Sequence, residues 1–263
     1  KIKPTIASNI KDINKKELLL INNSINNIKL PKNLVDIIIT DPPYGHNVQY
    51  LELSHFWFNW NKDLYNNKKV KFKDEAISNR KKFLNSKSIV DYENNLKKVF
   101  IKSYEILKPG GNLIMTFNNK NFSIFLALLT SVFKSGFLWK KNAIFFQDGV
   151  LNYKQTSHTQ AEGSPYGDFI YIFEKPVIPL KGKGSKISKI DLINKINNII
   201  NSYSKKKIKI EDLKIEIFKK IIPHIQSFYL NNQNPNNGLY EAFNVDFLKE
   251  LYEKKNKQFK NYN

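Results

Sequence analysis

The sequence predicts an α/β fold, because buried strand patterns alternate with helical ones. Residues 34–40 (LVDIIIT) form a nearly continuous β-branched run that stops abruptly at Asp41-Pro42-Pro43. Runs of this kind are typical of strands covered on both faces of a sheet, which favours α/β over a sandwich. Residues 91–107 then repeat apolar side chains at helical spacing and end at Pro109-Gly110-Gly111, and a second apolar run follows at residues 112–117.

The remaining elements follow from the same patterns. Residues 17–23 (ELLLINN) predict a short buried strand, and the aromatic and leucine residues between Val48 and Trp60 predict a helix packed into the core. The other predicted elements are a helix at residues 122–133 and strands at residues 137–147 and 168–174. Residues 61–90 have less hydrophobicity and more charge than their surroundings, which indicates an insertion.

The composition changes beyond residue 176. Prolines and a Lys-Gly-Lys-Gly-Ser run over residues 176–185 predict a linker. An isoleucine-rich helix with a capping box at Ser188 and Asp191 is expected after it, followed by helices at about 211–222 and 245–253. The predicted organisation is therefore an α/β region over 1–176 with a basic insertion at 61–90, and a linker with a small helical appendage over 177–263.

The composition excludes several classes of protein. The 263 residues include no cysteine, which excludes a disulfide scaffold, a thiolate metal site and a cysteine nucleophile. The four histidines lack ligand spacing, so no metal is expected. No apolar run reaches the length of a membrane span, and a cytoplasmic protein is expected. The chain opens on Lys1, which suggests that an upstream segment has been removed.

The net charge of +20 has two readings. The chain is rich in Lys, Asn and Ile, so the charge reflects either a coding bias or a nucleic-acid partner. The insertion is where a partner is most plausible. Its candidate phosphate contacts are Lys69, Lys71, Lys73, Arg80, Lys81 and Lys82, and the alternative is a solvated loop.

Asp41-Pro42-Pro43-Tyr44 is the motif that carries chemistry. Ligands of α/β sheets bind outside the carboxyl ends of the strands, where this motif lies. Two prolines fix the backbone and remove two amide donors, so a carboxylate and an oriented carbonyl lie side by side as acceptors. An –NH2 group suits such acceptors, and the tyrosine offers a face on which a planar ring stacks. The motif thus predicts a site for the exocyclic amine of a nucleobase.

The motif resembles the catalytic motif of S-adenosylmethionine-dependent DNA amino-methyltransferases, whose fold is a Rossmann-like sheet. The strand at residues 34–40 and the corner LKPGGNL at residues 107–113 are similar to the family's flanking segments, and the aromatic-rich stretch after the motif is similar to one of its subgroups. The resemblance covers roughly residues 17–176. It implies methylation of adenine N6 in DNA, in restriction-modification or phage defence, in a bacterial or phage-encoded, nucleoid-associated protein.

The same resemblance implies roles for individual residues. Asp41 and the Pro42 carbonyl would accept the two amine hydrogens, and Pro43 and Tyr44 would complete the catalytic loop, with Tyr44 stacked on a flipped-out base. Tyr44, Phe117 and Asn118 would line the target-base pocket. Residues 152–164 would lie near the base. Asn23 and Ser24, together with Asp41, would contact the S-adenosylmethionine.

The chain also departs from the family. The glycine-rich loop of the form Phe-x-Gly-x-Gly and the acidic residue for the ribose are absent. The sequence therefore resembles the second half of the catalytic domain, with the first strands and cofactor loop supplied upstream or by a partner subunit. Cytosine N4 methylation stays an alternative, although the family usually has Ser in place of Asp41 there. Protein glutamine methylation is less expected, because those sites more often read Asn-Pro-Pro-Tyr. A DNA-binding or scaffolding subunit, inactive alone, is the rival from another class.

Overall fold

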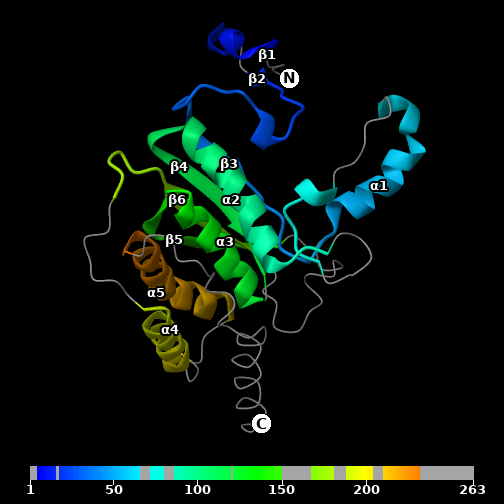
Figure 1. The fold of residues 1–263 in the computed structure, drawn as a ribbon. Coiled ribbons are helices and arrows are strands. Elements are labelled where there is room, and N and C mark those ends of the chain that lie inside the picture. The colour runs from blue at the N-terminus through cyan, green and yellow to red at the C-terminus, as the bar shows by residue number, and fades with distance from the viewer. Residues whose placement is uncertain are drawn as a thin grey trace.

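A four-stranded mixed sheet lies at the centre of the computed structural model, which describes residues 5–15, 18–65, 72–79, 86–119, 121–149, 167–180, 188–203 and 210–231 (Figure 1). The strand order is β3-β4-β6-β5, and β3 pairs parallel to β4 while β6 runs antiparallel to both neighbours. The strands are β3 (Val35–Thr40), β4 (Leu107–Phe117), β5 (Leu138–Asp148) and β6 (Gly167–Glu174). The α/β class is therefore confirmed.

Helices α2 (Ile89–Ile106) and α3 (Phe122–Lys134) lie together against one face of the sheet (Figure 1). The α2 helix begins at a capping box in which the Ser88 and Asp91 side chains each accept from the other residue's backbone amide. The α3 helix is buried from Phe122 to Phe133 because its sequence is apolar all round. Both helices begin and end close to where the sequence predicts them.

The opposite face of the sheet is apolar but only partly covered by the described residues. Ile39, Ile114 and Ile172 are direct cross-strand neighbours on β3, β4 and β6. Ile39 is 76% exposed and Ile37 is 54% exposed, whereas Ile114 and Ile172 are half-buried. The prediction that residues 34–40 are covered on both faces is therefore wrong for β3, since it lies at the edge of the sheet with one apolar face in solvent.

The Pro109-Gly110-Gly111 segment does not close the helix as predicted but lies within β4. The register moves from Val35 opposite Leu107 to Ile37 opposite Asn112, so the extra residues form a bulge. Gly110 has a φ of +79°, which suits glycine, and a Cβ on Gly111 would lie 2.8 Å from the Asp36 carbonyl oxygen.

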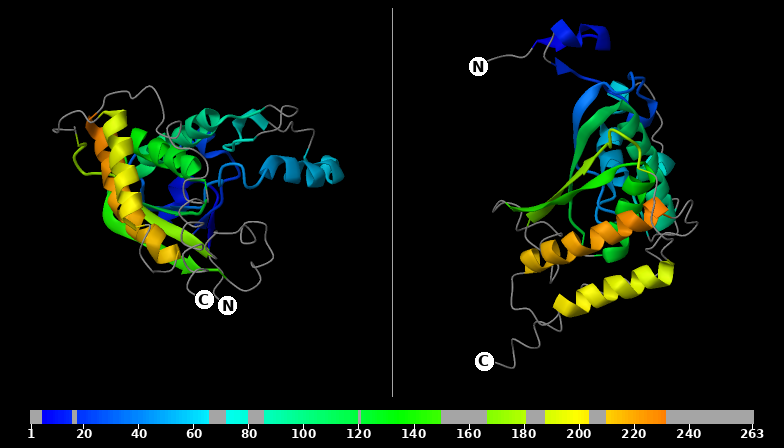
Figure 2. Two further views of the ribbon diagram at one scale, coloured as in Figure 1. Left: turned by 90° about the horizontal axis from the view of Figure 1, so that it is seen from below. Right: turned by 90° about the vertical axis from the view of Figure 1, so that its left-hand side faces the viewer.

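The C-terminal helices belong to the same core. Helices α4 (Lys189–Tyr203) and α5 (Ile210–Asn231) form successive layers beside the sheet (Figure 2). The Phe218 ring of α5 stacks on Phe125 of α3 with centroids 4.2 Å apart. The described part of residues 177–263 is therefore not a separate appendage, because the apolar face of α5 continues the core. The capping box at Ser188 and Asp191 is present, and the helix expected at 245–253 lies outside the described residues.

The segment after β3 differs most from expectation. Helix α1 (Tyr50–Trp60) forms as predicted, but it projects from the body and has no buried residue (Figures 1 and 2). Phe56, Trp57 and Trp60 are 56%, 66% and 76% exposed, so the prediction that they pack in the core is wrong. The helical spacing places these side chains on one surface of α1, but none of the described elements buries that surface.

The N-terminal segment forms small elements outside the main sheet. Strands β1 (Ile6–Ala7) and β2 (Leu18–Leu19) pair parallel, and the predicted strand at residues 17–23 is neither that long nor buried. Four 3-10 helices complete the described elements: η1 (Ile10–Lys15), η2 (Ile25–Asn27), η3 (Lys62–Tyr65) and η4 (Phe72–Asp74). None of the described helices combines the length and the apolar character that crossing a membrane requires.

Candidate active site

The Asp41–Tyr44 motif follows the carboxyl end of β3, beside the end of its parallel neighbour β4. Asp41 is exposed, and its Oδ1 accepts a hydrogen bond of 2.7 Å from Thr116 Oγ1 on β4. An ionised carboxylate has about four acceptor positions, and this bond uses one of them. Thr116 therefore orients Asp41 while leaving acceptor capacity for a ligand.

Tyr44 is half-buried beside Asp41 and is held at both ends of its side chain. Its ring lies 4.9 Å from the Phe117 ring, at an interplanar angle of 59°. Its hydroxyl donates to Asp168 Oδ1 on β6 at 3.2 Å. Burial raises the pKa of Tyr44, and the negative charges of Asp168 and Asp41 raise it further, so the hydroxyl stays protonated.

The backbone of the motif is anchored by side chains from two other elements. Tyr92 on α2 is fully buried, and its hydroxyl donates to the Pro43 carbonyl at 2.7 Å. Asn119, after β4, donates from Nδ2 to the Tyr44 carbonyl at 2.9 Å. Gly45 has a φ of +67°, and a Cβ there would lie 2.7 Å from Ile124 Cγ2. Tyr92, Asn119 and Ile124 thus fix the loop from three sides without a ligand.

Phe117 and Asn118, predicted to line a base pocket, lie next to Tyr44 but are engaged within the protein. Phe117 is 1% exposed and supports the Tyr44 ring from the core. Asn118 donates from Nδ2 to the Gly167 carbonyl at 2.7 Å, and its Oδ1 accepts from Lys214 Nζ of α5 at 3.0 Å. The structure therefore brings both residues to the site, and the surface there is provided by Tyr44 and Asp41.

Asn119 belongs to the segment 117–120 that the sequence places at the same crevice, and four residues that the sequence analysis did not single out complete the site: Tyr92, Thr116, Asp168 and Lys214. Thr116 could have been found, because it stands at the end of the next predicted strand, where the carboxyl ends of parallel strands meet. No pattern in the sequence indicated that α5 packs next to Asn118, since Lys214 and Asn118 are 96 residues apart.

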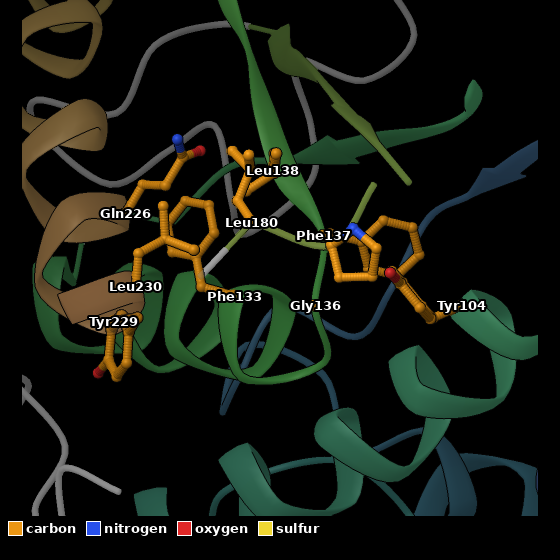
Figure 3. Close-up of a pocket in the computed structure, with 10 residues that line it drawn as sticks. Tyr104, Phe133, Gly136, Phe137, Leu138, Leu180, Gln226, Tyr229 and Leu230 are labelled. Carbon is orange, nitrogen blue, oxygen red and sulfur yellow. The ribbon is translucent and has the colours of Figure 1, made fainter. Parts of the chain in front are cut away.

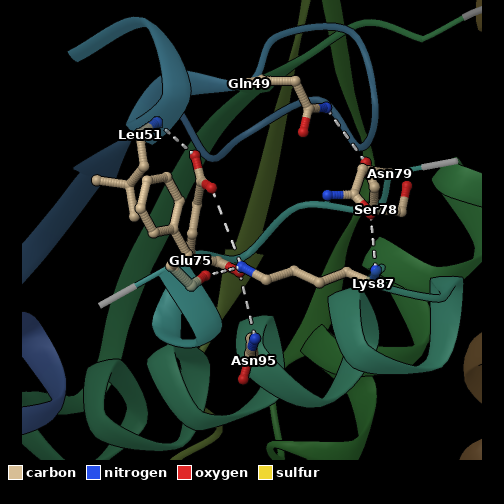
Figure 4. Close-up of polar contacts among 8 residues, drawn as sticks. Gln49, Leu51, Glu75, Ser78, Asn79, Lys87 and Asn95 are labelled. Atoms are coloured by element: carbon tan, nitrogen blue, oxygen red, sulfur yellow. Dashed lines mark hydrogen bonds and ion pairs between the residues drawn. The ribbon is translucent and has the colours of Figure 1, made fainter. Parts of the chain in front are cut away.

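The basic insertion contains an ordered polar cluster, defined by Glu75, Lys87 and the N-terminus of α1 (Figure 4). Lys87 is 7% exposed and donates to the carbonyls of Phe72 and Glu75. Glu75 Oε1 accepts from the Leu51 amide at 2.9 Å. Burial lowers the pKa of Lys87, and the nearby Glu75 opposes that shift. This cluster ties the insertion to the helix that follows the motif.

Most of the predicted phosphate contacts lie outside the described part of the insertion. Lys69, Lys71, Arg80, Lys81 and Lys82, like the predicted base-proximal loop at 152–164, lie outside the described residues. Lys73 belongs to the 3-10 helix η4, at residues 72–74. The DNA-contacting role of these residues stays a prediction.

The predicted cofactor contacts form no enclosed site in the part of the chain that the structure describes. Asn23 and Ser24 are exposed between β2 and η2, and Asn23 Oδ1 accepts from the Ser24 amide at 2.8 Å. No glycine-rich turn accompanies them, so these residues alone do not fit S-adenosylmethionine. Among the described residues, no group of His, Asp and Glu side chains could hold a metal ion.

A small cavity of about 90 Å³ lies between residues of α2, α3, β5 and α5 (Figure 3). Its walls include Tyr104, Phe137 and Leu138, near the end of β5 that pairs with Glu174. Gln226 in the wall accepts from the Trp139 amide at 2.6 Å. The cavity therefore lies at the end of the sheet away from Phe117 and Gly167, between packed elements, and is not part of the candidate site.

No protein-family model matches the sequence, and no curated protein matches it. Several solved structures show weak similarity, and two of them illustrate it. A candidate DNA modification methylase of Thermus thermophilus, complexed with S-adenosyl-L-methionine, gives a TM-score of 0.31 at 13% identity over 68% of this chain and 59% of its own. PvuII DNA methyltransferase, which is cytosine-N4-specific, gives a TM-score of 0.32 at 9% identity over 86% of each chain. This chain spans less than two thirds of the Thermus protein, and at these scores neither similarity bears on function.

Proposed function

We propose that Asp41–Tyr44 is the catalytic loop of a DNA amino-methyltransferase that acts on adenine N6. The observation that carries the proposal is the 2.7 Å bond from Thr116 to Asp41, which orients an exposed carboxylate next to the fixed ring of Tyr44. An oriented acceptor beside an aromatic face suits a planar base with an exocyclic amine. S-adenosylmethionine would supply the methyl group.

The residues of the loop have different roles in binding and activating the base. Asp41 and the Pro42 carbonyl each accept one hydrogen of the amine, which favours a tetrahedral nitrogen with a localised lone pair and stabilises the positive charge that develops on it. The Tyr44 ring stacks on the base after it leaves the duplex. The bond to Asp168 and the contact with Phe117 keep that ring from turning, so no ordering is required when the base arrives.

Cytosine N4 is the second candidate substrate. The loop chemistry is the same for both amines, and only the size of the base differs. Asp at position 41 favours adenine through the resemblance of the motif to the adenine enzymes. A further candidate is a DNA-binding or scaffolding subunit that is inactive alone, which the open arrangement around Asn23 and Ser24 favours.

We infer that another polypeptide segment or subunit supplies the binding site for S-adenosylmethionine. The apolar face of the sheet, which the described residues cover only in part, supports this inference. Ile39 stands at its edge, and the Ile39–Ile114–Ile172 row continues across three strands. A further parallel strand with a helix over this face would bury the row and place a loop beside Asp41.

Transfer of labelled methyl groups to DNA tests the proposal. The protein, with the segment or partner that completes it, is incubated with methyl-labelled S-adenosylmethionine and DNA, and the nucleosides are then separated. Label in N6-methyladenine is expected, and Asp41→Ala should abolish it while DNA binding persists. Label in N4-methylcytosine would move the assignment to the second candidate. Near-normal turnover by Asp41→Ala would overturn the role of the motif.

A further inference from the structure

Lys214 is a buried lysine directly beneath the candidate active site. It lies in the first turns of α5 and is 7% exposed, although lysine is almost never buried without partners. Its Nζ donates to Asn118 Oδ1 at 3.0 Å and to the Asn119 carbonyl at 3.3 Å. It also stands 4.6 Å from the Phe169 ring centroid and 5.5 Å from that of Phe218. The amine is therefore enclosed by β6, α5 and the turn after β4.

Of the two residues that Lys214 binds, Asn119 contacts the motif directly and Asn118 binds next to Asp168, a partner of Tyr44. Asn119, which is 4% exposed, donates from Nδ2 to the Tyr44 carbonyl at 2.9 Å. Asn118 binds the Gly167 carbonyl, next to the Asp168 that accepts from the Tyr44 hydroxyl. A chain of contacts thus runs from α5 through the turn at 118–119 to both the backbone and the side chain of Tyr44.

We propose that Lys214 is a positioning residue for the catalytic loop, and that it fixes Tyr44 through Asn118 and Asn119. The inference rests on the proposed function for its effect on methyl transfer, but the mechanical link itself does not. Burial of an amine is costly, and an apolar side chain of similar volume would pack against Phe169 and Phe218 without that cost. The use of lysine here is explained by the two acceptors that it orders.

Lys175 provides a matched control at the other end of the sheet. It is 9% exposed and donates to Asn33 Oδ1, the Tyr104 carbonyl and the Leu107 carbonyl at 2.7–2.8 Å. Its replacement removes a buried amine with three hydrogen bonds, one more than Lys214 makes, but none of its partners touches the motif. A general loss of stability would therefore be common to both variants, whereas a local effect on the loop would appear only for Lys214.

The experiment compares Lys214→Met and Lys175→Met by hydrogen–deuterium exchange and by methyl transfer. The Asn47 amide donates to the Tyr44 carbonyl at 3.3 Å, so its exchange reports the state of the loop. In Lys214→Met, exchange at residues 44–47 should accelerate by about tenfold, which corresponds to one lost hydrogen bond, and Lys175→Met should leave it unchanged. In the completed enzyme, kcat should fall by a similar factor in Lys214→Met alone, with KM for DNA unchanged.

Each result decides a separate point. Unchanged exchange at 44–47 in Lys214→Met overturns the positioning role, whether or not the protein transfers methyl groups. Accelerated exchange with an unchanged kcat also overturns it, because the loop order would then not matter to the reaction. Accelerated exchange in Lys214→Met, together with a wild-type protein that transfers no methyl group, would support the link and reject the proposed function instead.

Discussion

Thr116 Oγ1 lies 2.7 Å from Asp41 Oδ1, so the carboxylate at the end of β3 takes its orientation from the neighbouring strand. The two residues are 75 positions apart in the chain, and the parallel pairing of β3 with β4 brings them together. The hydroxyl donates to Asp41 and leaves further lone pairs on the carboxylate. The geometry of the sheet, rather than the motif alone, thus defines the acceptor.

Thr116→Val should lower methyl transfer while leaving the fold intact. Valine has nearly the same shape and β-branching but removes the donor, so Asp41 would sample other rotamers. A loss of about tenfold in kcat is expected, equivalent to one hydrogen bond to a charged group that is partly in solvent. Thr116→Ser keeps the hydroxyl and should retain most of the activity. Equal rates for the two variants would show that Thr116 does not orient Asp41.

Tyr92→Phe should destabilise the protein and loosen the motif together. The Tyr92 hydroxyl is fully buried and donates to the Pro43 carbonyl, so its removal leaves that acceptor without its partner at a cost of about 1–3 kcal/mol. Urea unfolding measures the change. Tyr104→Phe, on the same helix, is the control, since Tyr104 packs through its ring against Phe137. A Tyr92→Phe protein as stable as the Tyr104→Phe control would contradict the anchoring role of the hydroxyl.

Gly45→Ala should displace the end of the motif. The φ of +67° costs a non-glycine residue about 1–2 kcal/mol, and the new Cβ would meet Ile124 Cγ2 at 2.7 Å. Combining it with Ile124→Ala should relieve the clash but not the backbone strain. The double variant should therefore recover catalytic activity only in part, which steady-state kinetics would measure. Full activity of Gly45→Ala alone would mean that the turn tolerates a side chain.

Much of this arrangement could be predicted from local sequence. The strand at 34–40, the helix predicted at 91–107 and the α/β class all follow from patterns within about twenty residues. Burial could not be predicted in the same way. The spacing of Phe56, Trp57 and Trp60 defines a helix surface, but whether another element covers it depends on the rest of the fold, and here none of the described elements does.

The candidate site likewise combines residues that the local sequence could predict with residues that only the fold brings together. Asp41 and Tyr44 were predictable because a short motif after a strand has its own chemistry. Asp168 and Lys214 were not, since an aspartate at a strand start and a lysine on a helix are ordinary surface residues until the topology brings them together. Their roles arise from the antiparallel pairing of β4 with β6 and from the packing of α5 over the end of that pair.

Ile39→Lys should reduce self-association of the protein in the absence of the segment or partner that completes it. Exposed apolar edge strands pair with other chains, and lysine is a residue with which proteins block such edges. Ile39 is 76% exposed, so the folding free energy should change by no more than about 0.5 kcal/mol. Ile178→Lys is the control, because Ile178 is equally exposed but lies outside any strand. Sedimentation over a range of concentrations should show a smaller mean mass for Ile39→Lys only. Equal effects of the two variants would argue against association through β3.

Lys214 should make the stability of the protein depend on pH in a defined window. Burial lowers the pKa of Lys214 to about 7, and the negative charge of Asp168 on β6 only partly offsets this shift. Between that value and the ordinary lysine pKa of about 10.4, the unfolded chain binds a proton that the folded protein does not, so stability rises with pH. The slope cannot exceed about 1.4 kcal/mol per pH unit.

The difference in unfolding free energy between wild type and Lys214→Met isolates this contribution from those of Lys87 and Lys175, whose pKa values are lowered as well. The unfolding free energy of wild type should increase relative to that of Lys214→Met as pH rises from about 7 to about 9.5. Below about pH 7 the difference between the two should become constant. The buried tyrosines Tyr44, Tyr92 and Tyr171 do not interfere, because their raised pKa values affect stability only above the ordinary tyrosine pKa of about 10. Urea denaturation across this range measures the difference. A difference that stays constant with pH would mean that Lys214 keeps its proton in the folded protein, balanced by Asp168.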